Sequence, residues 1–140
     1  MTLSIRNRFP GTVTAVALGG VMSTVKVRLD AGPEVTAAIT VDAVQDLGLA
    51  DGVEVLVLVK STEVAVATGA VGSISIRNQI PGTVTEVDHG AVMTTVKIAV
   101  AGGGTLTAAI TKDAAEDLGL VEGADVTALV KSTEVSIALA

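Results

Sequence analysis

The chain has 140 residues, a formal net charge of −6, no cysteine and a single aromatic residue, Phe9. The lack of cysteine excludes disulfides and Cys/His zinc sites, and the acidic balance argues against nucleic acid, whose binding needs a basic surface and, for single strands, stacking aromatics. No apolar run approaches the roughly 20 residues of a membrane helix, and no secretory signal fits the N-terminus, so we expect a cytoplasmic protein without a membrane partner.

Alternating polar and apolar residues predict three strands in the first part of the chain. The first strand is expected over Leu3–Val16, with a break or bulge near Pro10-Gly11. Gly19-Gly20 suits a turn, and further strands are expected at Val21–Leu29 and Val35–Val41.

A short helix and two more strands are predicted to follow. The helix is expected over Asp42–Leu47, because Thr40 can cap its N-terminus and Gly48 suits its end. The last two strands are expected at Val53–Lys60 and Glu63–Ala67.

The chain is one module written twice. Residues 4–67 align with residues 75–138 without a gap, at a shift of 71 positions, and about 38 of the 64 aligned pairs are identical. We therefore expect module 1 at residues 1–68, a linker at residues 69–73 and module 2 at residues 74–140. A module of this size buries only about 60% of its unfolded surface, so we expect the modules to pack on each other and on other subunits.

Five short strands with one small helix after the third are typical of a Greek-key barrel of the oligonucleotide/oligosaccharide-binding (OB) type. We therefore expect a mainly β chain of two tandem OB-fold-like five-stranded barrels, each with one short helix. Periodicity alone leaves a small sandwich of the same elements open.

The repeat also shows which polar residues recur. Six of the nine basic residues form matched pairs: Arg6/Arg77, Lys26/Lys97 and Lys60/Lys131. Two of these pairs fall beside recurring hydroxyls, and the matched set is Ser4, Arg6, Thr40, Lys60 and Ser61, with Ser75, Arg77, Thr111, Lys131 and Ser132 as counterparts. Two cations and three hydroxyls without a carboxylate suit a small dianion, and the helix beginning after Thr40 adds free N–H groups.

Each member also has an ordinary structural explanation. Thr40 can be a simple helix cap, and Lys60-Ser61 can be the polar end of a strand. Arg6 can pair with Glu63 or Asp42 at the surface. A recent duplication also preserves residues that have no function.

No catalytic constellation is present in the sequence. The only histidine, His89, faces Leu18 in the other module and falls in an expected surface turn. Without cysteine or a paired histidine, a Ser–His or Cys–His pair cannot occur in both modules. Asp42 and Asp46 lie four positions apart and suit a solvated helix face. We therefore expect no enzyme.

Six recurring segments together resemble the Mop domain of the molbindins: Ser-Ile-Arg-Asn, Gly-Thr-Val, Gly-x-Val-Met-x-Thr-Val, Ala-Ala-Ile-Thr, Leu-Gly-Leu-x-x-Gly and Val-Lys-Ser-Thr-Glu-Val. The resemblance covers nearly the whole chain and is similar to the tandem, or di-Mop, molbindins. It implies an OB-type barrel and cytoplasmic binding of molybdate or tungstate at interfaces between modules. For a tandem member it also implies a homotrimer.

The resemblance assigns anion ligands to the matched set, with Ser4 and Arg6 from the first strand, Thr40 from the helix start, and Lys60 with Ser61 from the fourth strand. The counterparts in module 2 follow. Some relatives have a further serine ligand three positions after the threonine, where this chain has Ala43 and Ala114.

The resemblance also implies a second class of anion site near the threefold axis of the trimer, to which the turns after the first strands contribute. Its candidates are Gly19, Val21, Met22, Gly90, Val92 and Met93. From the residues alone, Met22 and Met93 are instead expected to pack in the core.

We therefore expect an oxyanion-binding protein for storage and homeostasis of molybdate or tungstate. It should hold the metal only as an oxyanion, without direct coordination and without an organic cofactor. The alternative is a molybdate-responsive regulatory or docking partner of another protein.

Overall fold

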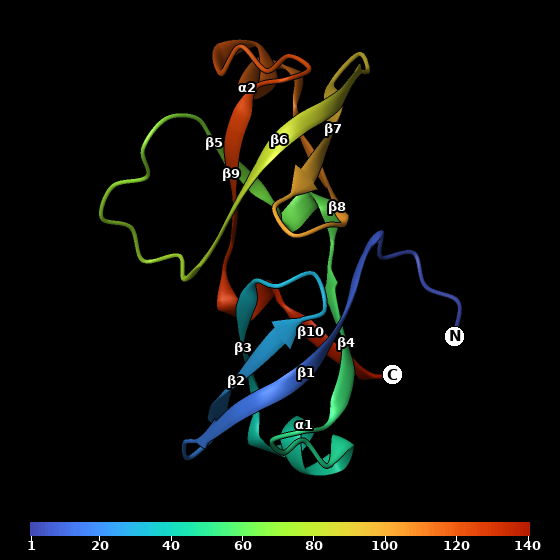
Figure 1. Cartoon of the computed structure of the whole chain (residues 1–140), viewed down its shortest axis with the longest axis vertical. Helices are drawn as coiled ribbons and strands as arrows, with labels where there is room; N and C mark the ends of the chain where they lie inside the picture. The colour runs from blue at the N-terminus through green and yellow to red at the C-terminus, as the bar shows by residue number, and fades with distance from the viewer.

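The computed structural model describes all 140 residues, which form two five-stranded antiparallel sheets stacked along the long axis of the molecule (Figure 1). The elements of the first repeat are β1 (Asn7–Leu18), β2 (Met22–Leu29), β3 (Glu34–Thr40), α1 (Val41–Leu47), β4 (Glu54–Val59), the 3-10 turn η1 (Ser61–Glu63) and β5 (Ala65–Ala67). The second repeat contains β6 (Asn78–His89), β7 (Met93–Val100), β8 (Thr105–Thr111), α2 (Lys112–Asp117), β9 (Asp125–Val130), η2 (Ser132–Glu134) and β10 (Ser136–Leu139).

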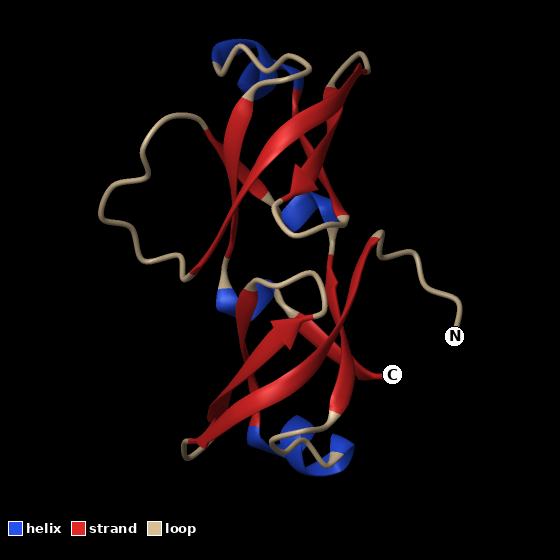
Figure 2. Cartoon of the chain, viewed as in Figure 1, coloured by secondary structure: helices blue, strands red, loops and turns tan.

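Strands dominate, and α1 and α2 lie at opposite ends of the molecule (Figure 2). The expected mainly β class is confirmed, and no helix is both long and apolar enough to cross a bilayer.

The fifth strand of each repeat belongs to the sheet of the other repeat. The strand orders are β10-β4-β1-β2-β3 and β5-β9-β6-β7-β8. Ile137 of β10 pairs with Val57 of β4, and Val66 of β5 pairs with Ala128 of β9. Each folded unit therefore combines four strands of one repeat with the last strand of the other.

The first strand runs through Pro10 without the expected break. The Pro10 carbonyl accepts a hydrogen bond of 2.9 Å from the Asp30 N–H, so its nitrogen faces β2. Pairing with β2 begins only at Gly11, and a residue without an N–H therefore costs the ladder nothing on that side. A Cβ on Gly11 would lie 2.7 Å from the Arg28 carbonyl oxygen, which explains the glycine.

The first and last strands of the repeat differ from expectation by more than one residue, whereas the other elements agree to within one residue at each end. The first strand runs over Asn7–Leu18 rather than Leu3–Val16, and its irregularity is a bulge between Val13 and Ala15. The expected last strand is shortened, because Glu63 belongs to the 3-10 turn η1 that carries the chain across to the other sheet.

The predicted helix cap is confirmed. The Thr40 hydroxyl accepts a 3.1 Å hydrogen bond from the Ala43 N–H, and Thr111 does the same for Ala114. Gly48 ends α1 with φ of 63°, a left-handed conformation that glycine adopts without a steric penalty.

Two buried asparagines join the two halves of the molecule. Asn7, 2% exposed, donates to the Thr107 carbonyl and accepts from the Thr107 N–H, both at 2.8 Å. Asn78, 4% exposed, bonds Thr36 in the same way, at 2.9 and 2.8 Å. A side-chain amide offers a donor and an acceptor side by side, so each asparagine replaces a missing neighbour strand at the edge of β8 or β3.

The hydrophobic core is continuous between the repeats. One cluster of 25 buried aliphatic residues includes members of both halves. Val64 and Val135, each 2% exposed, follow the 3-10 turns and are buried at the crossover. The hairpin tips also touch, since a Cβ on Gly102 would collide with the Ala31 carbonyl oxygen. The expectation that the modules gain burial by packing on each other is confirmed.

Replacing Asn7 with alanine should lower the free energy of unfolding by about 1–3 kcal/mol, because the N–H and carbonyl of Thr107 lose their partners. Urea denaturation followed by far-UV circular dichroism measures this change, since the chain lacks Trp and Tyr. Gln45→Ala, at an exposed amide on α1, is the matched control and should have little effect. Equal midpoints for the two variants would contradict the bridging role.

Cutting the chain in the linker should not separate its halves. A protease site placed between Gly69 and Gly72 would leave β5 and β10 in their exchanged positions, together with the asparagine bridges. Native size-exclusion chromatography should therefore show one species with the mass of the uncut protein, which serves as control. Elution of separate half-mass fragments would contradict the strand exchange.

Candidate anion-binding site

Two matching hollows lie where the two sheets meet, one in each repeat. Pocket 1 has a volume of about 240 Å³ and is lined by Ser4, Ile5, Arg6, Lys60, Ser61 and Thr62. Pocket 2 has a volume of about 250 Å³ and is lined by Ser75, Ile76, Arg77, Lys131, Ser132 and Thr133. Four of the five matched polar residues of each repeat therefore line one pocket.

Strand pairing explains why residues distant in sequence meet in each pocket. In the antiparallel β1–β4 ladder, Asn7 is paired with Val59. Arg6 directly precedes Asn7 and Lys60 directly follows Val59, so both cations lie at the same end of the ladder. Asn78 and Val130 are paired in the same way in β6–β9.

Arg6 holds the backbone of the segment before β1 through two hydrogen bonds. Arg6 Nε donates to the Ser4 carbonyl at 2.9 Å, and Nη2 donates to the Leu3 carbonyl at 3.0 Å. Arg77 holds Ser75 and Ile74 in the same way, at 3.1 and 2.7 Å. Because a guanidinium has further N–H groups, each arginine retains donors for a ligand.

Each pocket contains a buried hydroxyl without a partner. Ser61 Oγ and Ser132 Oγ are the only buried side-chain nitrogen or oxygen atoms in the structure that make no hydrogen bond. A buried polar atom left unpaired costs about 1–3 kcal/mol. The same unpaired hydroxyl recurs in both pockets, where it is a donor suited to an anion.

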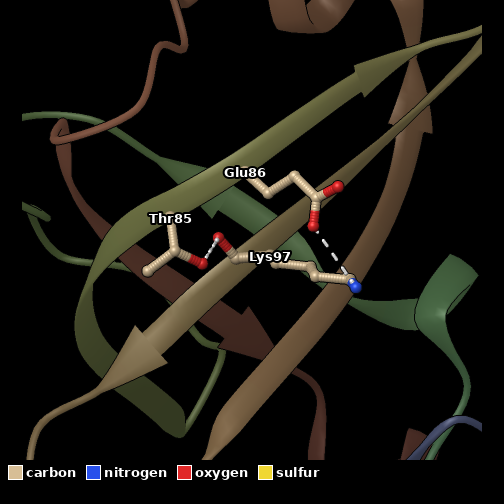
Figure 3. A network of polar contacts seen from close by, with 3 residues as sticks. All are labelled: Thr85, Glu86 and Lys97. Atoms are coloured by element: carbon tan, nitrogen blue, oxygen red, sulfur yellow. Dashed lines mark hydrogen bonds and ion pairs between the residues drawn. The ribbon is translucent and has the colours of Figure 1, made fainter.

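The pocket cations have no acidic partner. The only ion pair in the structure joins Lys97 Nζ to Glu86 Oε2 at 3.3 Å, on β6 and β7 beside the Thr85 hydroxyl (Figure 3). The alternative in which Arg6 pairs with Glu63 or Asp42 is therefore wrong. Unneutralised cations beside a donor hydroxyl form a site for a small anion.

The structure does not bring Thr40 into pocket 1 or Thr111 into pocket 2. Both threonines are exposed and cap α1 and α2, which lie at the outer ends of the molecule, far from the junction (Figure 1). Neither lines a pocket with its matched arginine. Within one chain, the set assigned by the Mop resemblance is divided between two places.

The turns of the proposed second site are also at the outer ends. The Gly19 N–H bonds the Met22 carbonyl at 2.9 Å, and the Val21 carbonyl accepts from the Val41 N–H at 2.8 Å. Val21 is 75% exposed and Met22 is 45% exposed, so core packing of this methionine is wrong.

The equivalent turn in the second repeat has the same geometry. The Gly90 N–H bonds the Met93 carbonyl at 2.8 Å, and Val92 and Met93 are 72% and 42% exposed. Both turns present apolar side chains to the surface, and no charged side chain of the matched set lies in them. His89 lies at the same end, exposed, with Nδ1 3.1 Å from the Thr94 hydroxyl oxygen.

Asn7 and Asn78 were not assigned a role from the sequence. Their identity in both repeats was a visible signal, but an amide carries no charge and suits many surface positions. Only the fold shows that each fixes the start of the strand that follows the pocket arginine.

Comparison with known proteins places this geometry in a family. The model of the TOBE domain matches residues 3–66 and 74–137. "Molybdenum transport protein ModE" of Azotobacter vinelandii is 39% identical over 139 residues, which are 99% of this chain and 52% of that protein. "Molybdenum-pterin-binding protein 2" of Clostridium pasteurianum is 48% identical over 65 residues, which are 46% of this chain and 96% of that protein.

A solved structure extends the likeness to the whole chain. The crystal structure of the cytoplasmic molybdate-binding protein ModG, with molybdate bound, has a TM-score of 0.97 and 36% identity and covers 100% of both chains. The chain spans about half the length of the first curated relatives that it matches. The fold and the two matching pockets thus define a tandem β-module protein with a pair of candidate anion sites. The chain belongs to the TOBE domain family, and its resemblance to the tandem Mop proteins is confirmed.

Proposed function

We propose that this protein binds molybdate or tungstate in pockets 1 and 2 and stores or buffers the oxyanion without changing it chemically. The observation that carries the proposal is the unpartnered buried serine hydroxyl beside two unneutralised cations in each pocket. The family supports it, since the ModG structure that matches along the whole chain contains molybdate.

The pocket residues divide the work of holding a tetrahedral dianion. Arg6 and Lys60 supply charge, and Ser4 and Ser61 supply hydroxyl donors. Neither an organic cofactor nor direct metal coordination is needed, because the oxygens of the anion face the protein. The cations are exposed in a single chain, so their attraction is screened by salt unless another surface covers the pocket.

A second copy of the chain is proposed to cover each pocket. Thr40 and Thr111 lie too far away to contribute within one chain, and each is next to an exposed apolar turn that includes Val21 or Val92. Docking of these ends onto the pockets of other subunits would bury the apolar turns and bring a threonine hydroxyl to each anion. We propose a homotrimer located in the cytoplasm.

Regulatory docking on another protein was the alternative from the sequence, and we do not propose it. The pockets support an anion-binding function, and the protein that matches along the whole chain is described as molybdate-binding.

Replacing Lys60 and Lys131 with alanine should abolish tight binding. Loss of one charged hydrogen bond costs about 1.5–3 kcal/mol per pocket, which is more than tenfold in affinity. Equilibrium dialysis against molybdate in excess sulfate, with elemental analysis of bound molybdenum, measures the effect. The control is Lys26→Ala with Lys97→Ala, which removes the same charge from β2 and β7 outside the pockets. Unchanged affinity in the pocket variant, or an equal loss in the control, would refute the assignment.

Light scattering should give three times the chain mass of 13.9 kDa.

Thr40→Val with Thr111→Val should weaken molybdate binding although neither residue lines a pocket of its own chain. Thr→Ser at both positions keeps the hydroxyl and the helix cap, so that control should bind normally. A monomer whose valine variant binds molybdate as well as wild type would exclude the shared site.

A further inference from the structure

Pockets 1 and 2 have identical linings but different neighbours. Two positions after the pocket arginine, the first repeat has Arg8 and the second has Gln79. The two pockets therefore form an internal comparison in which one nearby position differs by a positive charge.

Arg8 binds the backbone of the segment that lines pocket 1. Its Nη2 donates to the Leu3 carbonyl at 2.6 Å, and its Nε donates to the Ile5 carbonyl at 3.0 Å. Arg6 Nη2 donates to the same Leu3 carbonyl at 3.0 Å. Because both guanidinium groups bond one oxygen atom, they lie within a few ångströms of each other, and the second charge is close to the pocket.

Pocket 2 has a weaker version of this arrangement. Gln79 is neutral and makes one such bond, from Nε2 to the Ile76 carbonyl at 3.2 Å. The Ile74 carbonyl, the counterpart of Leu3, accepts a side-chain hydrogen bond only from Arg77. The segment beside pocket 2 therefore carries one cation fewer and is held by fewer side-chain hydrogen bonds.

We propose that Arg8 makes pocket 1 the tighter of two unequal oxyanion sites. The proposal rests on the proposed function of the pockets. Arg8 has no acidic partner, so its field is not cancelled locally, and it acts on the anion from outside the lining. One extra charge roughly 8–10 Å from a dianion, across water, strengthens binding about fivefold at low ionic strength.

Unequal sites would serve a buffer. With two affinities, pocket 1 fills at low molybdate concentration and pocket 2 fills only when the concentration rises. The chain then releases and takes up anion over a wider range of concentration than two equal sites allow.

The test isolates each pocket and exchanges the two residues. Lys131→Ala disables pocket 2, so that only pocket 1 binds, and Lys60→Ala disables pocket 1, so that only pocket 2 binds. Equilibrium dialysis of each variant with molybdate then gives the dissociation constant of the remaining pocket. Pocket 1 should bind about fivefold more tightly. Arg8→Gln should weaken pocket 1 to the level of pocket 2, and Gln79→Arg should strengthen pocket 2 by a similar factor. The gain in the second exchange is independent of any folding defect in the first.

Two further measurements separate charge from backbone support. Arg8→Lys keeps the charge but not the paired hydrogen bonds, so it should retain most of the preference, and the preference should shrink as salt rises. A lysine variant as weak as Arg8→Gln, with a preference indifferent to salt, would overturn the charge role. Equal affinities of the two isolated pockets would overturn this inference alone. Absence of molybdate binding in the wild-type chain would instead overturn the proposed function.

Discussion

The reciprocal amide bonds of Asn7 and Asn78 are the interaction on which the arrangement depends. Each asparagine is the first residue of its strand and bonds the backbone of an edge strand in the other half of the molecule. Edge strands present unpaired N–H and carbonyl groups that must find partners. By satisfying them, the asparagines fix the distance between the sheets. They also fix the position of Arg6 and Arg77, which directly precede them.

Strand exchange explains the unusual chemistry of the pockets. After Lys60 the chain must leave one sheet and enter the other, and it does so through a tight 3-10 turn followed by the buried Val64. That turn buries the Ser61 hydroxyl without giving it an acceptor. An unpaired buried hydroxyl is a local cost that is expected where the group has a use, and here both copies of the turn carry it. The crossover therefore forms part of each candidate anion pocket as well as joining the halves.

The sequence predicted the elements better than their partners. Alternation located the strands, and the Thr40 cap was correct, because both depend on neighbours in the chain. The exchange of β5 and β10 was not predicted, since periodicity shows which face of a strand is buried but not which sheet receives it. Pro10 was misleading for a related reason: its nitrogen faces the side on which pairing begins only at Gly11, so its missing N–H does not break the strand. The repeat selected four residues that line one pocket in each half of the molecule. It could not show that Thr40 lies at the far end of the chain's own fold.

A tandem chain can do what two identical modules cannot. In an assembly of single modules every pocket has the same sequence, so all pockets have the same intrinsic affinity. Joining two modules in one chain lets one copy change alone, as at Arg8 and Gln79. Comparing the two repeats for identical residues identifies the shared candidate ligands but passes over positions such as these. The matched residues therefore describe what both pockets hold, and the unmatched ones beside them describe how the two pockets differ.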